Sequence, residues 1–164
     1  VCGVFSMGLI YRQQYMWSVA AIMANRLCDG LDGSTAHFSG RTDFGGFLDI
    51  VCDFIVYAGI VFAFGMQTES YKNAALFLLF SFIGPMVSFL AYATIAEKKG
   101  IQTSVRGNKS FYYLGGLCEG AETALLLILI CLFPHLFHYF AYTFGVMCWL
   151  TSVGRTYAAH CLEK

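Results

Sequence analysis

The sequence predicts an all-α membrane protein, a bundle of six transmembrane helices. Hydrophobic residues make up 58% of its 164 residues and charged residues only 12%, whereas soluble domains carry about 25% charged residues. Uncharged stretches long enough to cross a bilayer recur along the chain, since a spanning helix needs about 20 mostly apolar residues. We therefore expect residues 1–164 to form a single transmembrane domain without a soluble module.

Three helices are expected in the first part of the chain. Residues 1–11 are apolar but too short to span a membrane, so the first helix is expected to be truncated in this chain. A second helix begins at residue 15 and runs past residue 27 into a group of aspartates. A third extends over about residues 44–66.

Three more helices are expected in the second part. Residues 73–96 carry no charge, and Gly84 and Pro85 in their middle predict a kink. A basic loop, residues 97–110, follows. The uncharged stretch 123–154 is too long for one span. Pro134 divides it, which predicts a fifth helix over 111–133 and a sixth over about 137–159.

The distribution of Lys and Arg predicts the orientation of the bundle. If the helices alternate in direction, the ten basic residues divide into eight on one side and two on the other. The larger group is Arg26, Arg41, Lys98, Lys99, Arg106, Lys109, Arg155 and Lys164, and the smaller is Arg12 and Lys72. Because basic residues are retained on the cytoplasmic side, we expect a multi-pass protein whose aspartates face the cytoplasm. The net charge of zero gives no sign of a nucleic-acid partner.

Four aspartates form the chemical centre of the sequence. Asp29 and Asp32 are three residues apart, Asp49 and Asp53 are four apart, and a glycine-rich link joins the two pairs. Residues at these spacings share one face of a helix. Four carboxylates in one small volume repel each other, and the apolar surroundings make unpaired acids costlier still. Divalent cations bound by carboxylate oxygens resolve this repulsion, so the pattern predicts a metal site at the ends of two helices.

Small residues accompany the aspartates at fixed positions. The order is Asp29-x-x-Asp32-Gly33-x-x-Ala36, then Gly45-x-x-x-Asp49-x-x-x-Asp53. This pattern resembles the signature of the CDP-alcohol phosphatidyltransferases, integral membrane enzymes of phospholipid synthesis. The family has Arg directly after the Ala, where this chain has His37, and the central link is slightly short. The resemblance extends to the six-helix layout and covers nearly the whole chain, without the family's N-terminal amphipathic segment.

The resemblance implies an activity. It implies transfer of a phosphatidyl or related phospho-alcohol group from a CDP-linked donor, expected to be CDP-diacylglycerol, to a small alcohol acceptor, with release of CMP. Two divalent ions, Mg²⁺ or Mn²⁺, would be bound by Asp29, Asp32, Asp49 and Asp53 and would bridge the diphosphate. Asp53 looks like the general base that removes the proton of the acceptor alcohol.

Nucleotide contacts are also implied by the resemblance. They fall on Asp32, Gly33, Ala36, His37, Arg41 and Gly45. Small residues at three of these positions permit close approach of the nucleotide to the backbone. The family's Arg pairs with the nucleotide phosphate, whereas a neutral imidazole at His37 supplies at most one donor. Arg41 lies one turn further on if the stretch is helical and could reach the same phosphate; otherwise the chain is a weak or specialised member.

Candidate acceptor contacts lie outside the aspartate pattern. Arg106, Lys109 and Arg155 are expected to contact a phosphorylated acceptor, and attraction of such residues to anionic lipids is the alternative. Glu119 and Glu122 are expected within the fifth helix, well below its cytoplasmic end. They either shape the acceptor pocket, or one of them pairs with Arg155 as a structural contact. The sequence favours neither interpretation.

Two other functions stay open. The chain could be a non-catalytic relative that binds a CDP-lipid without turnover, an alternative that His37 keeps open. It could also be a cation carrier, because acid clusters in membranes mark ion pathways. Against a carrier, Asp29 and Asp32 lie at a helix end rather than mid-membrane, where carriers bind their substrates. The expected partners are the CDP-linked donor, the acceptor and membrane lipids, and the resemblance implies a homodimer. The residues do not indicate which alcohol is the acceptor.

Overall fold

The computed structural model describes residues 2–39, 43–98 and 118–161, with the backbone alone for 29–39, 43, 96 and 97. In chain order the elements are α1 (Cys2–Tyr11), α2 (Tyr15–Ser39), α3 (Asp43–Gly65), α4 (Glu69–Lys98), α5 (Gly120–Leu132), a short 3-10 helix (Pro134–Leu136) and α6 (Phe137–Cys161). All regular structure in these ranges is helical. The predicted all-α membrane bundle is confirmed.

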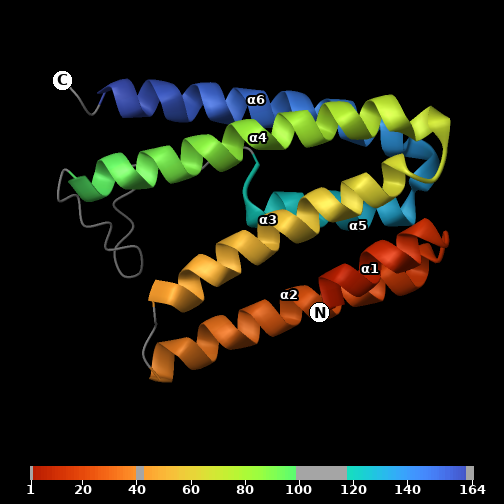
Figure 1. Cartoon of the computed structure of the whole chain (residues 1–164), viewed down its shortest axis with the longest axis horizontal. Coiled ribbons are helices and arrows are strands. Elements are labelled where there is room, and N and C mark those ends of the chain that lie inside the picture. Colours follow the sequence, from red (N-terminus) through yellow and green to blue (C-terminus); the bar gives the residue numbers. More distant parts are fainter. Residues whose placement is uncertain (1, 40–42, 99–117, 162–164) are drawn as a thin grey trace.

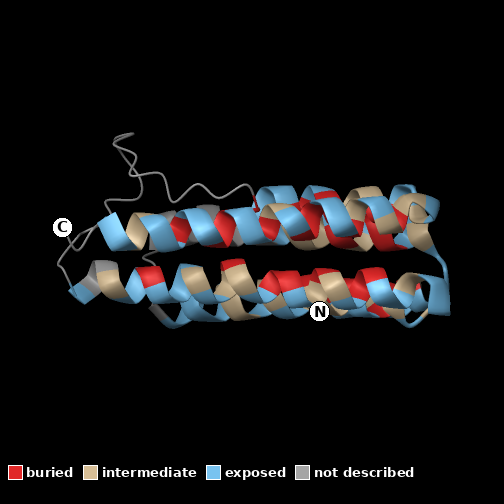
Figure 2. Ribbon diagram, turned by 90° about the horizontal axis from the view of Figure 1, so that it is seen from above, coloured by how far each residue is buried: buried red, intermediate tan, exposed pale blue. Residues whose placement is uncertain are grey.

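The helices run along one common direction, in two layers (Figures 1 and 2). α1 packs against α2 and α3, α3 against α4, and α4 along α6, while α5 contacts α2 and α3. The ends of α2, α4 and α6 lie at the same end of the bundle as the start of α3 (Figure 1). The end of α2 and the start of α3, which carry the aspartate pattern, therefore lie at the same end of the bundle as the ends of α4 and α6.

Two of the described helices are long and apolar enough to cross a membrane by themselves, through the segments Phe44–Gly65 and Glu69–Ile95. α5 and α6 meet this criterion only as a pair, bent by 115° at Pro134. The count of two or three such spans is lower than the six expected. α5 has 13 described residues, about 20 Å at 1.5 Å per residue, less than the roughly 30 Å hydrocarbon core.

The predicted third and sixth helices agree with α3 and α6 to within two residues at each end. α2 is longer than expected, because the helix continues through the first aspartate pair to Ser39. α4 begins at Glu69 instead of residue 73 and continues through Pro85. Its early start has a local cause: Thr68 Oγ1 accepts a hydrogen bond from the Ser70 backbone N–H at 3.2 Å, as an N-cap side chain does.

The fifth helix begins later than predicted. Residues 111–117 lie outside the described chain, but Glu119 is extended (φ −110°, ψ −171°) and α5 starts at Gly120. The Glu122 carboxylate accepts the Glu119 backbone N–H at 3.1 Å, one half of a capping box. The expectation that Glu119 and Glu122 lie well inside a membrane helix was therefore wrong. They form its first turn, and both are exposed.

Aromatic side chains hold together the end of the bundle opposite the aspartates. The ring of Phe64 is stacked between Tyr15 and Phe137, with centroid separations of 5.8 and 5.0 Å. The Tyr15 hydroxyl donates to Gln67 Oε1 at 2.9 Å, and the Tyr71 hydroxyl donates to the Pro134 carbonyl at 2.9 Å. The turns between helices at this end are thus tied to one another by stacking and hydrogen bonds.

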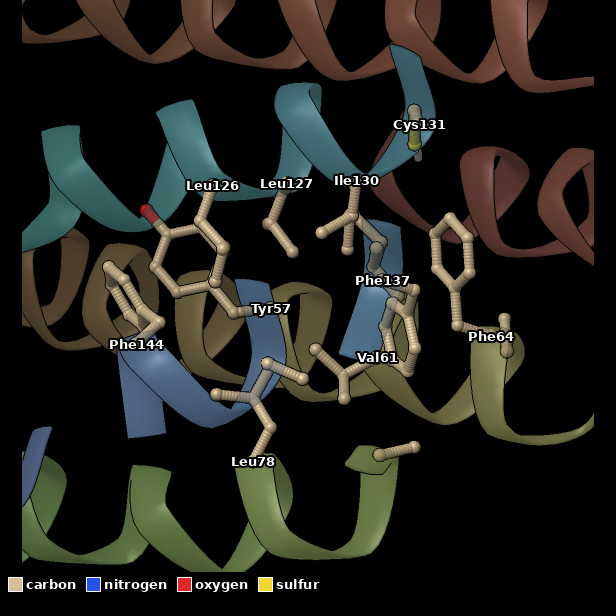
Figure 3. Packing of buried hydrophobic residues seen from close by; sticks show 14 of the residues in the cluster. Tyr57, Val61, Phe64, Leu78, Leu126, Leu127, Ile130, Cys131, Phe137 and Phe144 are labelled. Carbon is tan, nitrogen blue, oxygen red and sulfur yellow. The ribbon is translucent and has the colours of Figure 1, made fainter. Parts of the chain in front are cut away.

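Packing in α3 changes along its length. No residue from Phe44 to Val56 is buried, whereas Tyr57, Ile60, Val61 and Phe64 are. Figure 2 shows the buried residues concentrated in the half of the bundle that carries the helix turns, and Figure 3 shows several of them packed together. Asp53 therefore lies one turn outside the packed core.

Small residues bring α4 and α6 close together. A Cβ atom at Gly84 would overlap the Ser152 side chain, and one at Gly145 would lie 2.5 Å from Phe77. Neither position has room for a side chain without movement of its neighbour, which is how small residues promote helix contact in membranes.

Candidate active site

The described half of the aspartate pattern lies on α3, where Asp49, Asp53 and Tyr57 follow one another at four-residue intervals. This spacing places them along one side of the helix. Asp49 is exposed, the Asp53 side chain is 27% exposed, and Tyr57 is buried, with only 6% of its surface exposed. The three residues thus lead from the open end of the bundle into its core.

Arg26 of α2 reaches across to this side of α3. Its Nη2 is ion-paired with Asp53 Oδ1, and its Nη1 donates to Asp53 Oδ2 at 3.1 Å. Two parallel bonds from one guanidinium to one carboxylate are the strong, orienting form of this interaction. The Arg26 side chain is 25% exposed, so the pair lies at the margin of the core.

Tyr57 completes the cluster. Its hydroxyl donates to Asp53 Oδ2 at 3.0 Å and accepts from Arg26 Nη1 at 2.8 Å. The guanidinium also lies 5.3 Å from the centre of the Tyr57 ring, within the range of a cation–π contact. The ring itself packs beside Leu126 of α5 and Phe144 of α6 (Figure 3). Arg26, Asp53 and Tyr57 therefore form one connected group, called here the Arg26 cluster.

A second polar cluster centres on Arg155 of α6, whose side chain is 8% exposed. Its Nη1 donates to the Pro85 carbonyl of α4 at 3.0 Å, and its Nη2 lies 3.6 Å from Glu119 Oε1. The guanidinium is 5.6 Å from the centre of the Phe89 ring. Arg155 thus joins α4, α6 and the start of α5, and the pairing alternative stated for the glutamates is seen at Glu119.

The two clusters meet at the start of α5. A Cβ atom at Gly120 would lie 3.6 Å from the Tyr57 hydroxyl, so Gly120 sits directly against the Arg26 cluster. Glu119, its chain neighbour, is held by Arg155. The start of α5 therefore lies within van der Waals range of α3.

Other predicted site residues are placed by backbone alone or lie outside the described chain. Asp29, Asp32, Gly33, Ala36 and His37 lie in α2, within three turns after Arg26, and their side chains are not described. Gly45 lies in the exposed first turn of α3. Arg41, Arg106 and Lys109 fall outside the described ranges. Where side chains are described, no group of three or more His, Cys, Asp or Glu residues could hold a metal, and only two of the four aspartates are included.

Sequence reasoning missed Arg26 and Tyr57 as members of the site. Arg26 was counted only toward the membrane orientation. A signal was present: an arginine one turn before an acidic pair, inside an apolar helix, requires a partner. The four-residue step from Asp53 to Tyr57 is the corresponding signal on α3.

Comparison with known proteins decides the family. The family model for CDP-alcohol phosphatidyltransferase matches residues 1–154. The chain belongs to this family. The family resemblance predicted from the aspartate pattern is confirmed, and membership in the CDP-alcohol phosphatidyltransferases supports a phosphotransferase activity of the CDP-alcohol type. Such enzymes generally depend on divalent metals.

A relative in this family is also recognisable. The chain is 45% identical over 163 residues to "Inner membrane protein YnjF" of Escherichia coli (strain K12). The aligned region covers 99% of this chain and 79% of that protein. Together with the apolar helices, this similarity supports a membrane protein. No solved structure matches the chain.

Proposed function

We propose that the protein transfers a phosphatidyl or related phospho-alcohol group from CDP-diacylglycerol, or another CDP-linked donor, to an alcohol, and releases CMP. The observation that carries this proposal is the family match, because it spans the whole pattern from Asp29 to Asp53. The proposal places this site on the cytoplasmic side of the membrane, where the basic helix ends gather. The homodimer implied by the resemblance stays a prediction.

The proposed reaction needs one base and one leaving group. The acceptor hydroxyl gives its proton to Asp53, its oxygen forms a bond to the lipid-side phosphorus, and the bond from that phosphorus to the CMP oxygen breaks, so that CMP leaves with the electron pair. Asp53 is suited to this role because its carboxylate is held by Arg26 and Tyr57 at the edge of the core. A base held at a fixed position within reach of the hydroxyl is what proton transfer requires.

The exposure of Asp49 supports a role as a ligand of a divalent cation. Asp49 is exposed, so its oxygens can turn toward a ligand, whereas those of Asp53 already accept bonds from the Arg26 cluster. We propose that Asp29, Asp32 and Asp49 are the ligands of Mg²⁺ or Mn²⁺, and that the remaining acceptor direction of Asp53 serves the proton transfer. When bound, the two ions supply positive charge to the diphosphate and the departing CMP.

The remaining contacts follow from the pattern. Asp32, Gly33, Ala36, His37, Arg41 and Gly45 are proposed to contact the nucleotide. Arg106 and Lys109 are proposed to contact a phosphorylated acceptor, near Glu119 and Glu122. Arg155 is already engaged with Pro85 and Glu119, so we propose that it serves this acceptor site by holding the start of α5.

One assay tests the proposed function. Purified protein is incubated with Mn²⁺, CDP-diacylglycerol and a panel of alcohols, and CMP is measured. We expect CMP release that requires an alcohol and that is lost in Asp53→Asn but kept in Glu69→Gln, which alters only an exposed ion pair at the other end of the bundle. CDP-lipid binding without CMP for any acceptor would instead indicate a non-catalytic relative. Metal flux in liposomes without nucleotide binding would indicate a carrier.

A further inference from the structure

We propose that Arg26 is a positioning residue of the transfer reaction. With Tyr57, it holds the Asp53 carboxylate so that one acceptor direction on Oδ1 stays available for the alcohol hydroxyl. The inference rests on the proposed function, in which Asp53 takes the proton of the acceptor. It assigns a role to a side chain that lies outside the aspartate pattern.

The hydrogen bonds of Asp53 define this direction. A carboxylate has about four lone-pair directions on its two oxygens. Within the described part of the chain, Oδ2 accepts two bonds, from Arg26 Nη1 at 3.1 Å and from Tyr57 at 3.0 Å, and Oδ1 is paired with Arg26 Nη2. Three of the four directions are therefore used by the Arg26 cluster. The fourth, on Oδ1, can accept a further donor without breaking any of these bonds.

The Arg26 cluster is anchored to the rigid part of the bundle. Tyr57 is the first buried residue of α3, and its hydroxyl, which accepts from Arg26 Nη1 at 2.8 Å, is packed against Gly120. The planar guanidinium is thereby fixed at Nη1 by the tyrosine and at both Nη1 and Nη2 by the carboxylate. Because Asp53 itself lies outside the packed core, these contacts, rather than burial, keep its side chain in one orientation.

Arginine is better suited to this task than lysine. A guanidinium presents donors in a rigid fork that matches both carboxylate oxygens, whereas an ammonium is a point charge on a flexible stem. A glutamine keeps one NH₂ group but loses the charge and the fork. Arg26 is not among the residues proposed to contact the nucleotide, and its described contacts are to Asp53 and Tyr57. Loss of Arg26 should therefore slow the chemical step more than it weakens donor binding.

The reaction step affected is the proton transfer. The hydroxyl proton moves to Asp53 Oδ1, the hydroxyl oxygen bonds to the donor phosphorus, and the electron pair of the broken P–O bond leaves with CMP. Arg26 neither gains nor loses a proton in this sequence. Displacement of a catalytic group by about 1 Å costs on the order of a hundredfold in rate, which bounds the expected effect.

The test compares kinetics with binding. In the purified full chain with Mn²⁺, we expect Arg26→Gln to lower kcat for CMP release by about tenfold to a hundredfold. The KM for CDP-diacylglycerol and the Kd for CDP should stay within about threefold, since uniform binding is untouched. Arg26→Lys should recover part of the kcat. Lys72→Gln, which breaks the exposed pair with Glu69, is the matched control and should leave all three values unchanged.

Each outcome decides the matter. Unchanged kcat in Arg26→Gln, or a loss of CDP binding as large as the loss of kcat, would overturn the inference while leaving the proposed function intact. If both Arg26 variants fail to fold, Tyr57→Phe decides: it keeps the ion pair but removes the tyrosine's bonds to Asp53 Oδ2 and to Arg26 Nη1. We expect kcat to fall about threefold to tenfold with binding unchanged. No CMP from the wild-type protein with any alcohol would overturn the proposed function, and this inference with it.

Discussion

Replacement of Arg155 by methionine is expected to destabilise the bundle by about 3 kcal/mol. The largest contribution is the bond from its buried guanidinium to the Pro85 carbonyl, since hydrogen bonds to charged groups contribute about 1.5–3 kcal/mol. The 3.6 Å pair with Glu119 adds less than about 1 kcal/mol, because Glu119 is 46% exposed. The contact with the Phe89 ring adds roughly 0.5–1 kcal/mol. Methionine retains the apolar packing of the side-chain stem, so the loss reports mainly the polar contacts.

Equilibrium unfolding in mixed micelles, titrated with a denaturing detergent and followed by far-UV circular dichroism, measures this loss. Glu119→Gln should cost less than about 1 kcal/mol, and the exposed pair of Lys72 and Glu69 provides a control variant, Lys72→Met, that should cost less than about 0.5 kcal/mol. A loss below about 1 kcal/mol in Arg155→Met, or a larger loss in Glu119→Gln than in Arg155→Met, would refute the assignment of stability to the Pro85 bond.

Four further predictions concern the core, the helix interface and the reaction. Phe137→Ala should lower the free energy of unfolding by about 3–5 kcal/mol, because the ring is fully buried in the aromatic stack. Gly145→Leu should lower the free energy of unfolding by more than about 1 kcal/mol in the same titration, since even a Cβ atom at this position would lie 2.5 Å from Phe77. Chelation with EDTA should abolish CMP release and added Mn²⁺ should restore it, with Asp49→Asn needing a higher Mn²⁺ concentration for half-maximal rate. His37→Arg should preserve or raise affinity for CDP in a calorimetric titration; a large drop would mean that the imidazole has a role of its own.

Hydropathy was sufficient for the long helices and insufficient where local hydrogen bonds set the boundaries. The bounds of α3 and α6 were predicted closely because polar residues or a proline flank long, mostly apolar stretches. The start of α4 was misplaced because the prediction began with the uncharged stretch 73–96, although the Thr68 side chain caps a helix that begins at Glu69. The start of α5 was misplaced because Glu119 was read as a charge inside a helix, whereas its extended backbone and Glu122 begin that helix.

The candidate site was likewise predictable from the sequence only in part. The aspartate pattern is local, so its spacing alone led to the family that the comparison confirmed. The partner of Asp53 is 27 residues away on another helix, and periodicity carries no information about which faces of two helices will meet. Only the three-dimensional arrangement shows that the long Arg26 side chain of α2 reaches Asp53 of α3.

The uneven packing of α3 bears on how a lipid reaches the proposed chemistry. In its open half, Phe44, Phe47, Leu48 and Ile55 are all well exposed, and in a bilayer such side chains meet hydrocarbon. A donor with two acyl tails can keep those tails in the oily phase beside this half while its headgroup approaches Asp49 and Asp53. For the proposed lipid donor, lateral arrival from the bilayer would then not require extraction of the fatty chains into water.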